Sequence, residues 1–340
     1  MTHVLLARMD SDGDVLLSGP AVRAAAARAT RVTYLCGPRG RAAAGLLPGV
    51  DEVVCHHCPW IDAHPQPVDR AAIDALVQDV ARRRVDEAIV LTSFHQSPLP
   101  LALLLRLAGV ARLAATSVDY PGSLLDVRHR IADDVHEVER ALDLLAAAGY
   151  PPPPGDGGAL AVERPAAGWD GVPDGPYVVV HPGASVPARA WAPERHAALV
   201  RALRDDGHRV VVTGAPSETA LTAQVAGDGA VDLGGATTLA ELAEVLAHAT
   251  CVVVANTGPA HLAAAVGTPV ASLFAPTVPP WRWRPWGVPH ELLFVEVPCA
   301  GCRARDCPVP GHPCIEQIAT EQVVVAVERF AAARAGTVAA

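Results

Sequence analysis

The chain has 340 residues, a length typical of about two domains. Hydrophobic residues make up 51% and charged residues 19%, which provides for a sizeable core and argues against intrinsic disorder. The formal net charge of -9 argues against a nucleic-acid-binding protein, because such proteins hold phosphates with an excess of basic residues. All 27 basic residues are arginine, so a site that usually needs Lys must here use Arg or do without.

No targeting or membrane segment stands out in the sequence. A short apolar run near the N-terminus is followed at once by charged residues, unlike a signal peptide. Residues 99–115 are the most apolar stretch, but Arg106 and Arg112 interrupt it, so it falls short of a membrane-spanning helix. We therefore expect a cytoplasmic protein whose eight cysteines are reduced or metal-bound rather than paired in disulfides.

In the first half of the chain, apolar runs alternate with helical patterns. Residues 3–7 predict a strand, 10–14 a polar turn and 15–29 a helix. A helical pattern also covers residues 68–84. The remaining strands of this half are expected at residues 31–36, 52–54, 88–91 and 113–115. Strands that alternate with helices indicate βαβ units and a parallel sheet.

A proline- and glycine-rich segment divides the sequence. Four consecutive prolines, at residues 151–154, are followed by glycines, which favours an extended linker. We expect an N-terminal domain at residues 1–150, the linker at 151–176 and a C-terminal domain at 177–340. The elements predicted after the linker are strands at 177–180, 209–213, 251–255 and 270–274, and helices at 193–203, 239–247, 260–266 and 320–334.

The predicted fold class is therefore α/β, with two Rossmann-like, doubly wound domains facing a central cleft. In open α/β sheets, ligands bind at the carboxyl ends of the strands, so the loops at those ends are the first places to look for chemistry.

The first such loop is acidic, with the sequence Asp-Ser-Asp-Gly-Asp at residues 10–14. A calcium loop would need Gly at its sixth position and Glu at its twelfth, where this chain has Val15 and Ala21. Asp14 instead follows a glycine at the expected turn into a helix, where a carboxylate can accept a proton from a hydroxyl group. From the residues alone, helix capping by these acids is an equally good interpretation.

Two loops of the second half predict an anion site. His-Pro-Gly-Ala-Ser at residues 181–185 follows a strand, so its backbone N–H groups, together with Arg189, can face a phosphate. An ordinary solvated loop is an equal alternative at that position. The stronger signal is residues 256–261, Asn-Thr-Gly-Pro-Ala-His, where a buried strand leads into a helix capped by Thr257. The N–H groups of that helix start, with Asn256 and His261, can hold an anion.

Cysteines cluster near the end of the second half, at Cys299, Cys302, Cys307 and Cys314. Four thiols at such spacing can form a closed structural zinc site, although the second pair does not repeat the spacing of the first. We favour cysteines that tie down the loop by packing and keep zinc as the alternative. The segment Cys-His-His-Cys at residues 55–58 is a weaker candidate of the same kind, which we interpret as structural.

Several of these motifs, in this order, resemble glycosyltransferase family 9, the group typified by ADP-heptose:lipopolysaccharide heptosyltransferases. The Gly-Asp-Val-Leu turn at residues 13–16 looks like the family's first motif, and His-Glu-Val-Glu-Arg at 136–140 looks like its helix before the linker. The segments that resemble the family in the second half are residues 181–185, 189–191, 256–265, 274–277 and the Cys299–Cys314 pattern. Neither a Walker loop nor a dinucleotide-binding glycine fingerprint is found, which argues against P-loop nucleotidases and dehydrogenases.

The resemblance implies the GT-B fold and an inverting, metal-independent glycosyltransferase that moves heptose from ADP-heptose to an acceptor hydroxyl. It implies that Asp14 is the general base. It also implies a donor diphosphate site at Asn256, Thr257, Gly258 and His261, with Ser185 and Arg189 on the opposite rim. The nucleotide sugar is then a co-substrate, and catalysis needs no further cofactor.

Two features qualify what the resemblance implies, and two alternative functions remain open. Asn256 stands where the family often has Asp, and Arg189 where it commonly has Lys. The acceptor is an envelope glycan or a small metabolite, and no nucleic acid is expected as a partner. The alternatives are a non-catalytic nucleotide-sugar-binding homologue and a nucleotide-sugar epimerase or hydrolase on the same fold.

Overall fold

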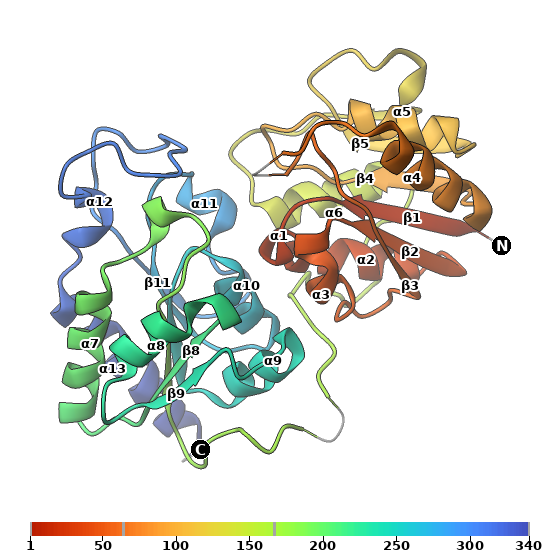
Figure 1. Cartoon of the computed structure of the whole chain (residues 1–340). Helices are drawn as coiled ribbons and strands as arrows, with labels where there is room; N and C mark the ends of the chain where they lie inside the picture. The colour runs from red at the N-terminus through yellow and green to blue at the C-terminus, as the bar shows by residue number, and fades with distance from the viewer. Residues whose placement is uncertain (1, 63–64, 166–167, 339–340) are drawn as a thin grey trace. The chain divides into compact units, whose positions relative to one another are not determined.

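The computed structural model describes residues 2–62, 65–165 and 168–338. The chain forms two compact units, Met1–Val162 (unit 1) and Glu163–Ala340 (unit 2), and their boundary falls within residues 151–176. Each unit is built on its own six-stranded parallel sheet flanked by helices (Figure 1). None of the helices in the described ranges is both long and apolar enough to cross a membrane.

Unit 1 contains a sheet with the strand order β3-β2-β1-β4-β5-β6, and all its strand pairs are parallel. Its strands are β1 (His3–Arg8), β2 (Arg31–Cys36), β3 (Glu52–Cys55), β4 (Glu87–Val90), β5 (Arg112–Thr116) and β6 (Val127–His129). Its α-helices are α1 (Asp12–Leu17), α2 (Gly19–Ala26), α3 (Arg41–Ala44), α4 (Arg70–Arg83), α5 (Leu99–Leu107) and α6 (Glu137–Ala147). Short 3-10 turns lie at η1 (Pro38–Gly40) and η2 (Gly122–Leu124).

The single helix predicted at residues 15–29 is in fact two helices, because α1 ends at Leu17 and α2 begins at Gly19. Pro20 has no N–H to continue the first helix, and its ring would crowd the preceding turn. The Ser18 hydroxyl compensates for the break by donating to the Val15 carbonyl at 2.6 Å. The predicted polar turn is also shorter than expected, since α1 already begins at Asp12 and carries Asp14 in its first turn.

Unit 2 repeats this architecture with the order β12-β11-β10-β7-β8-β9, again with parallel pairs throughout. Its strands are β7 (Val178–His181), β8 (Val210–Gly214), β9 (Val231–Gly234), β10 (Cys251–Ala255), β11 (Val270–Leu273) and β12 (His290–Leu293). Its α-helices are α7 (Pro193–Asp205), α8 (Thr219–Ala226), α9 (Leu239–His248), α10 (Gly258–Ala265), α11 (Pro280–Trp283), α12 (Pro313–Glu316) and α13 (Thr320–Val338). Its 3-10 turns are η3 (Pro187–Arg189) and η4 (Pro216–Glu218).

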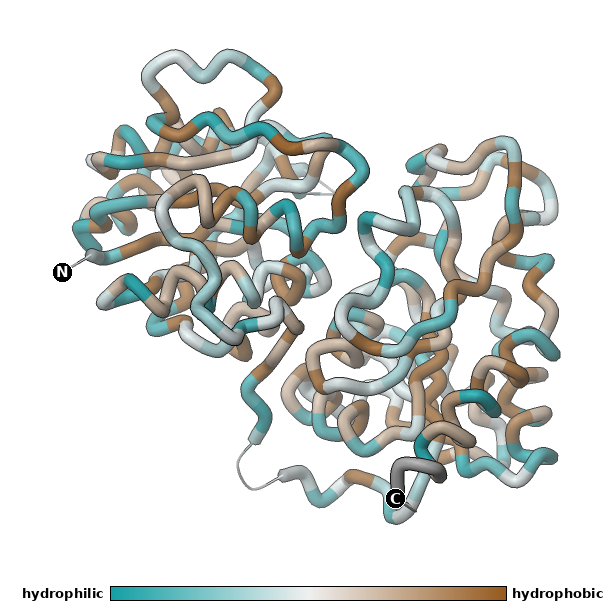
Figure 2. The backbone as a smooth tube through the Cα atoms, turned by 180° about the vertical axis from the view of Figure 1, so that it is seen from behind, coloured by the Kyte–Doolittle hydropathy of each residue, from teal (hydrophilic) through white to brown (hydrophobic). Residues whose placement is uncertain are grey.

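The inner strands were predictable because they are continuous buried apolar runs, and β7 and β10 are buried along their whole length. Three strands that the sequence pattern did not predict, β6, β9 and β12, all lie at sheet edges. They are short and partly exposed, so they lack the apolar run that marks an inner strand. Figure 2 shows hydrophobic stretches gathered inside each unit, where the sheets and helices pack.

Counted within its own unit, each sheet has the order 3-2-1-4-5-6 of a Rossmann domain. The chain reverses direction across the sheet between β1 and β4 in unit 1 and between β7 and β10 in unit 2. Ligands of such sheets bind outside the carboxyl ends of the strands at these switch points. The predicted α/β fold class is confirmed. It places a candidate site in each unit at the switch point, on the edge of the sheet that the carboxyl ends of the strands form.

Candidate functional site

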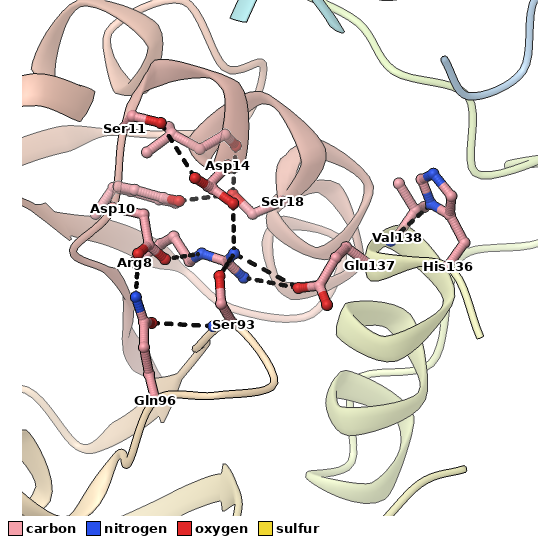
Figure 3. A network of polar contacts seen from close by, with 12 residues as sticks. Arg8, Asp10, Ser11, Asp14, Ser18, Ser93, Gln96, His136, Glu137 and Val138 are labelled. Carbon is pink, nitrogen blue, oxygen red and sulfur yellow. Dashed lines mark hydrogen bonds and ion pairs between the residues drawn. The ribbon is translucent and has the colours of Figure 1, made fainter. Parts of the chain in front are cut away.

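The switch point of unit 1 is organised around Arg8, the last residue of β1, which is 3% exposed. Its guanidinium contacts three carboxylates: Nε lies 2.6 Å from Asp10 Oδ2, Nη2 lies 2.9 Å from Asp14 Oδ1, and Nη1 lies 3.4 Å from Glu137 Oε2. Nη2 also donates to Ser93 Oγ at 2.9 Å, from the loop after β4. Figure 3 shows these side chains converging on the guanidinium from β1, α1, α6 and that loop. We call Arg8, Asp10, Asp14 and Glu137 the Arg8 cluster.

Local sequence features hold each acid in this cluster. Asp14 lies in the first turn of α1, where a negative charge is favourable to the helix dipole. Its Oδ2 accepts from the hydroxyl of Ser11, the N-cap residue, at 3.1 Å. Glu137 is the first residue of α6, whose start is fixed by a capping box: His136 Nδ1 accepts from the Val138 N–H, and the His136 N–H donates to the Glu139 carboxylate.

The electrostatics of the cluster follow from one cation facing three acids. Burial alone would lower the pKa of Arg8, but Asp10, Asp14 and Glu137 raise it above its ordinary value, so the guanidinium stays charged. Burial raises the pKa of Asp10 above its usual range, against the opposing effect of Arg8. The Gln96 side-chain amide donates a hydrogen bond to Asp10 Oδ1. The cluster is thus a buried ionic network in which the number of acids exceeds that of cations.

A small polar pocket adjoins the cluster. Arg8 and Glu137 form part of its wall, with Thr92, Thr116 and Arg140 as its other polar lining residues. Thr92 is 7% exposed, and its hydroxyl has no hydrogen-bond partner among the described residues. A buried hydroxyl of this kind usually has a partner, and a single hydroxyl group entering this small pocket could supply one.

The switch point of unit 2 presents neutral groups instead. Asn256 follows β10 and is 6% exposed. Neither Nδ2 nor Oδ1 of its side-chain amide has a partner within the described part of the chain. Thr257 then caps α10 with extended backbone, and Gly258 and Pro259 form the first positions of the helix. The positive end of that helix and the unpartnered side-chain amide of Asn256 point to an anionic or hydroxylated ligand.

The second predicted loop meets the first at this edge. Arg189, at the end of η3, donates from Nη1 to the main-chain carbonyl oxygen of Asn256 at 3.3 Å. His261, the fourth residue of α10, is 5% exposed. Ser185 is exposed in the loop after β7. The structure therefore brings Arg189 to the Asn256 loop, whereas the part that Ser185 plays remains a prediction.

The 181–185 loop depends on its glycine, and the histidine before it is neutral. A Cβ at Gly183 would lie 2.2 Å from a carboxylate oxygen of Glu218, so a larger residue would displace that acid. Burial lowers the pKa of His181 to about 4, and its Nδ1 lies 2.9 Å from the Thr213 hydroxyl. His181 is therefore uncharged at neutral pH, and Arg189 is the permanent cation of the two predicted loops.

The four cysteines near the C-terminus line one small pocket together with His312. Cys314 is buried, Cys307 is partly buried, and Cys299 and Cys302 are exposed, all as free thiols. No three His, Cys, Asp or Glu side chains in the described ranges are arranged to hold a metal ion, so the zinc alternative receives no support. Packing accounts for Cys314 but not for the two exposed thiols. In the Cys55–Cys58 segment, His56 instead contacts Asp79 at 3.0 Å.

The sequence analysis found Asp14 but missed the residues that hold it. Glu137 was noted only as part of the His-Glu-Val-Glu-Arg motif, and Arg8 and Ser93 were not singled out. An arginine ending an apolar strand was an available signal, because such a charge is rarely buried without partners. Its partners could not be named from spacing, since Ser93 and Glu137 lie 85 and 129 residues away.

Comparison with known proteins agrees with this architecture. Residues 73–312 match the family described as Glycosyltransferase family 9 (heptosyltransferase). Lipopolysaccharide heptosyltransferase 1 of Pseudomonas aeruginosa is 30% identical over 66% of this chain and 64% of its own length. Lipopolysaccharide heptosyltransferase 3 of Escherichia coli is 36% identical over 32% of this chain and 34% of its own length. The matches thus span between about a third and two thirds of these curated relatives.

The structural similarity to known proteins covers nearly the whole chain. The structure of E. coli heptosyltransferase WaaC with ADP-2-deoxy-2-fluoro heptose has a TM-score of 0.73 and 24% identity, and the match covers 96% of this chain and 99% of that one. The two-sheet α/β architecture is thus that of the GT-B heptosyltransferases. With a family match over most of its length and this shared fold, the chain belongs to glycosyltransferase family 9.

Proposed function

We propose that the protein is an inverting, metal-independent glycosyltransferase that transfers heptose from ADP-heptose to an acceptor hydroxyl. Family membership supports glycosyl transfer, and the name of the solved WaaC complex supports an ADP-heptose type of donor. The observation that carries transfer, rather than binding alone, is the Asp14 carboxylate, held on both oxygens at the switch point of unit 1. A pure binding module has no need of such a base.

The donor diphosphate is assigned to the α10 edge of unit 2. Thr257, Gly258 and the start of α10 face the phosphates, and the side-chain amide of Asn256 is available to hydrogen-bond them. Arg189 and His261 add donors, and Ser185 closes the other rim. As the bond between C1 and the phosphate oxygen breaks, the ADP leaves with the electron pair, and these groups stabilise its growing charge. Loss of one such donor costs about 3 kcal/mol in the barrier.

The acceptor is assigned to unit 1. Asp14 takes the proton of the acceptor hydroxyl while the oxygen forms its bond to C1, which inverts the anomeric carbon in a single displacement. The proposed acceptor is an envelope glycan or a small metabolite, and the buried Thr92 hydroxyl beside the Arg8 cluster can bond one of its hydroxyl groups. The charge on the leaving group is balanced by Arg189 and helix N–H groups, so we expect full activity in the presence of a chelator.

The test is a donor screen with the purified full chain. ADP-heptose, other nucleotide-activated sugars and free nucleotides are first ranked by thermal shift, because a ligand bound only by the folded state raises the melting temperature. ADP release is then measured with and without glycan and small-metabolite acceptors. Acceptor-dependent ADP release supports the proposal. Donor binding without release would instead indicate a binding homologue, and turnover without any acceptor would indicate an epimerase or hydrolase.

A further inference from the structure

The exposure of the three acids around Arg8 differs in a way that suggests separate tasks. The Glu137 side chain is 1% exposed and that of Asp10 10%, whereas that of Asp14 is 22% exposed. Asp14 is therefore the acid of the Arg8 cluster that an incoming molecule can reach most easily. The Asp10 and Glu137 carboxylates are more buried beside the guanidinium, and Glu137 also forms part of the wall of the polar pocket.

Arg8 connects Asp14 to distant parts of unit 1. Its Nη2 donates to both Asp14 and Ser93 at 2.9 Å, and its Nη1 lies 3.4 Å from Glu137 (Figure 3). Helix α6 and the loop after β4 thus fix the guanidinium, and the guanidinium fixes Asp14. With Ser11 holding the second oxygen, the Asp14 carboxylate has both a fixed direction and a permanent positive charge beside it.

We propose that Arg8 is the positioning residue of the reaction, which holds Asp14 as an oriented carboxylate, and that Glu137 anchors Arg8 for this task. This inference rests on the proposed function, in which Asp14 is the base. Arginine suits the role because it remains charged when buried and can serve several acceptors at fixed angles. Without it, Asp10, Asp14 and Glu137 would lose the cation that all three contact, which favours protonation of the acids.

Charge predicts opposite effects for the two partners of Asp14. In Arg8→Gln the cation is lost, so the Asp14 carboxyl should titrate about 1–3 pH units higher than in the unchanged protein. In Glu137→Gln a negative charge is lost from the Arg8 cluster while an acceptor oxygen remains, so Asp14 should titrate at the same pH or lower. Arg8 contacts Asp14 directly, Asp10 and Glu137 contact Arg8, and the buried cation Arg140 of α6 lines the same pocket as Arg8 and Glu137. A general loosening of the fold would instead shift the pH at which Asp14 titrates in the same direction in both variants.

The experiment follows the carboxyl carbons of 13C-labelled aspartate by NMR through a pH titration, with Asp14→Asn to assign the signal. It compares the unchanged protein with Arg8→Gln, Arg8→Lys and Glu137→Gln. Arg23→Gln is the matched control, because Arg23 makes a two-bond ion pair with Asp156 elsewhere in unit 1. Circular dichroism checks the fold of each variant. If Arg8→Gln fails to fold, Arg8→Lys takes its place in the comparison. Lysine keeps the positive charge but cannot make all the contacts of the guanidinium.

A rise in the Asp14 titration in Arg8→Gln, a smaller rise in Arg8→Lys and none in Glu137→Gln or Arg23→Gln support the proposal. An Asp14 titration that is unchanged in both Arg8 variants overturns it, as does an equal rise in the Glu137 variant. Because this titration needs no substrate, it remains informative if no donor is turned over and the proposed function fails. Where ADP release is measurable, kcat should fall at least tenfold in Arg8→Gln, with the affinity for ADP unchanged.

Discussion

The two switch points of this protein use the same strand order for opposite kinds of edge. In unit 1 the edge is charged and its key acid is already held, since both oxygens of Asp14 accept hydrogen bonds from neighbouring side chains. In unit 2 the edge carries Asn256, whose amide atoms have no partner in the described residues. An edge that satisfies its own groups is preorganised for chemistry, whereas one with unpartnered buried groups is incomplete without its ligand.

The largest effect is expected from removing the charge at the first edge. Asp14→Asn keeps an oxygen that can accept from Arg8 but cannot take up a proton at neutral pH. The rate of ADP release should fall by about 10²–10⁴-fold, the usual contribution of a general base. Calorimetry should show unchanged affinity for ADP, because ADP is assigned to the other unit. Undiminished turnover in this variant would remove Asp14 from its role.

Unit 2 buries a neutral histidine, so the stability of the protein should fall when the pH is lowered. Burial lowers the pKa of His196, on α7, to about 3, against an ordinary value of 6.5. The unfolded chain therefore binds the proton first, so this stabilising contribution is complete above pH 6.5 and is lost as the pH falls toward 3. We expect a loss of at least about 2 kcal/mol, followed as the melting temperature against pH.

The control for this pH effect is built into the chain. His196→Phe retains a ring against Trp191, which the native ring meets edge-on at a centroid distance of 5.1 Å. This variant should make the profile between pH 6.5 and 4 less steep and leave the part that comes from the buried His181. His248→Gln, at a largely exposed site, should leave the profile unchanged. An identical acid transition in all three proteins would assign the loss of stability to other groups.

Replacing Asn256 tests whether the second edge is incomplete without its ligand. Asn256→Leu removes two unpartnered buried polar atoms at similar volume, so the free protein should become more stable by about 1–3 kcal/mol. The same variant should weaken ADP binding about tenfold or more. Thermal melts with and without ADP measure both effects together. A variant that is less stable without ADP and binds it normally would show that the amide is satisfied in the free protein.

The smallest effects are expected at the cysteine pocket of unit 2. Cys314→Ala should destabilise the protein by about 1–2 kcal/mol because Cys314 is 6% exposed and packs in the interior. Cys299→Ala and Cys302→Ala, at exposed positions, should stay within about 0.5 kcal/mol. Chemical denaturation measures all three. Equal and large losses at the three sites, with zinc in the purified protein, would instead revive a metal-bound cluster.

Much of the architecture is legible in the sequence because it arises from local signals. The buried runs of β2 and β10 and the helix start at Thr257 and Pro259 each depend on a few neighbouring residues. Such signals identified the parallel α/β class and the anion-binding turn before any contact was known. They failed where a strand is short and at an edge, as in β6, and where one proline divides a helix, as at Pro20.

Only the tertiary structure decided how the candidate base is held. A carboxylate in the first turn of a helix has the same local signature whether it caps the helix or serves a reaction, so Asp14 could not be interpreted further from its neighbours. The distinction depends on Arg8 meeting Glu137 and Ser93, residues brought together by strand order across the sheet. Sequence patterns report short-range preferences, whereas a buried ionic network depends on long-range packing, and that is why this part required the folded chain.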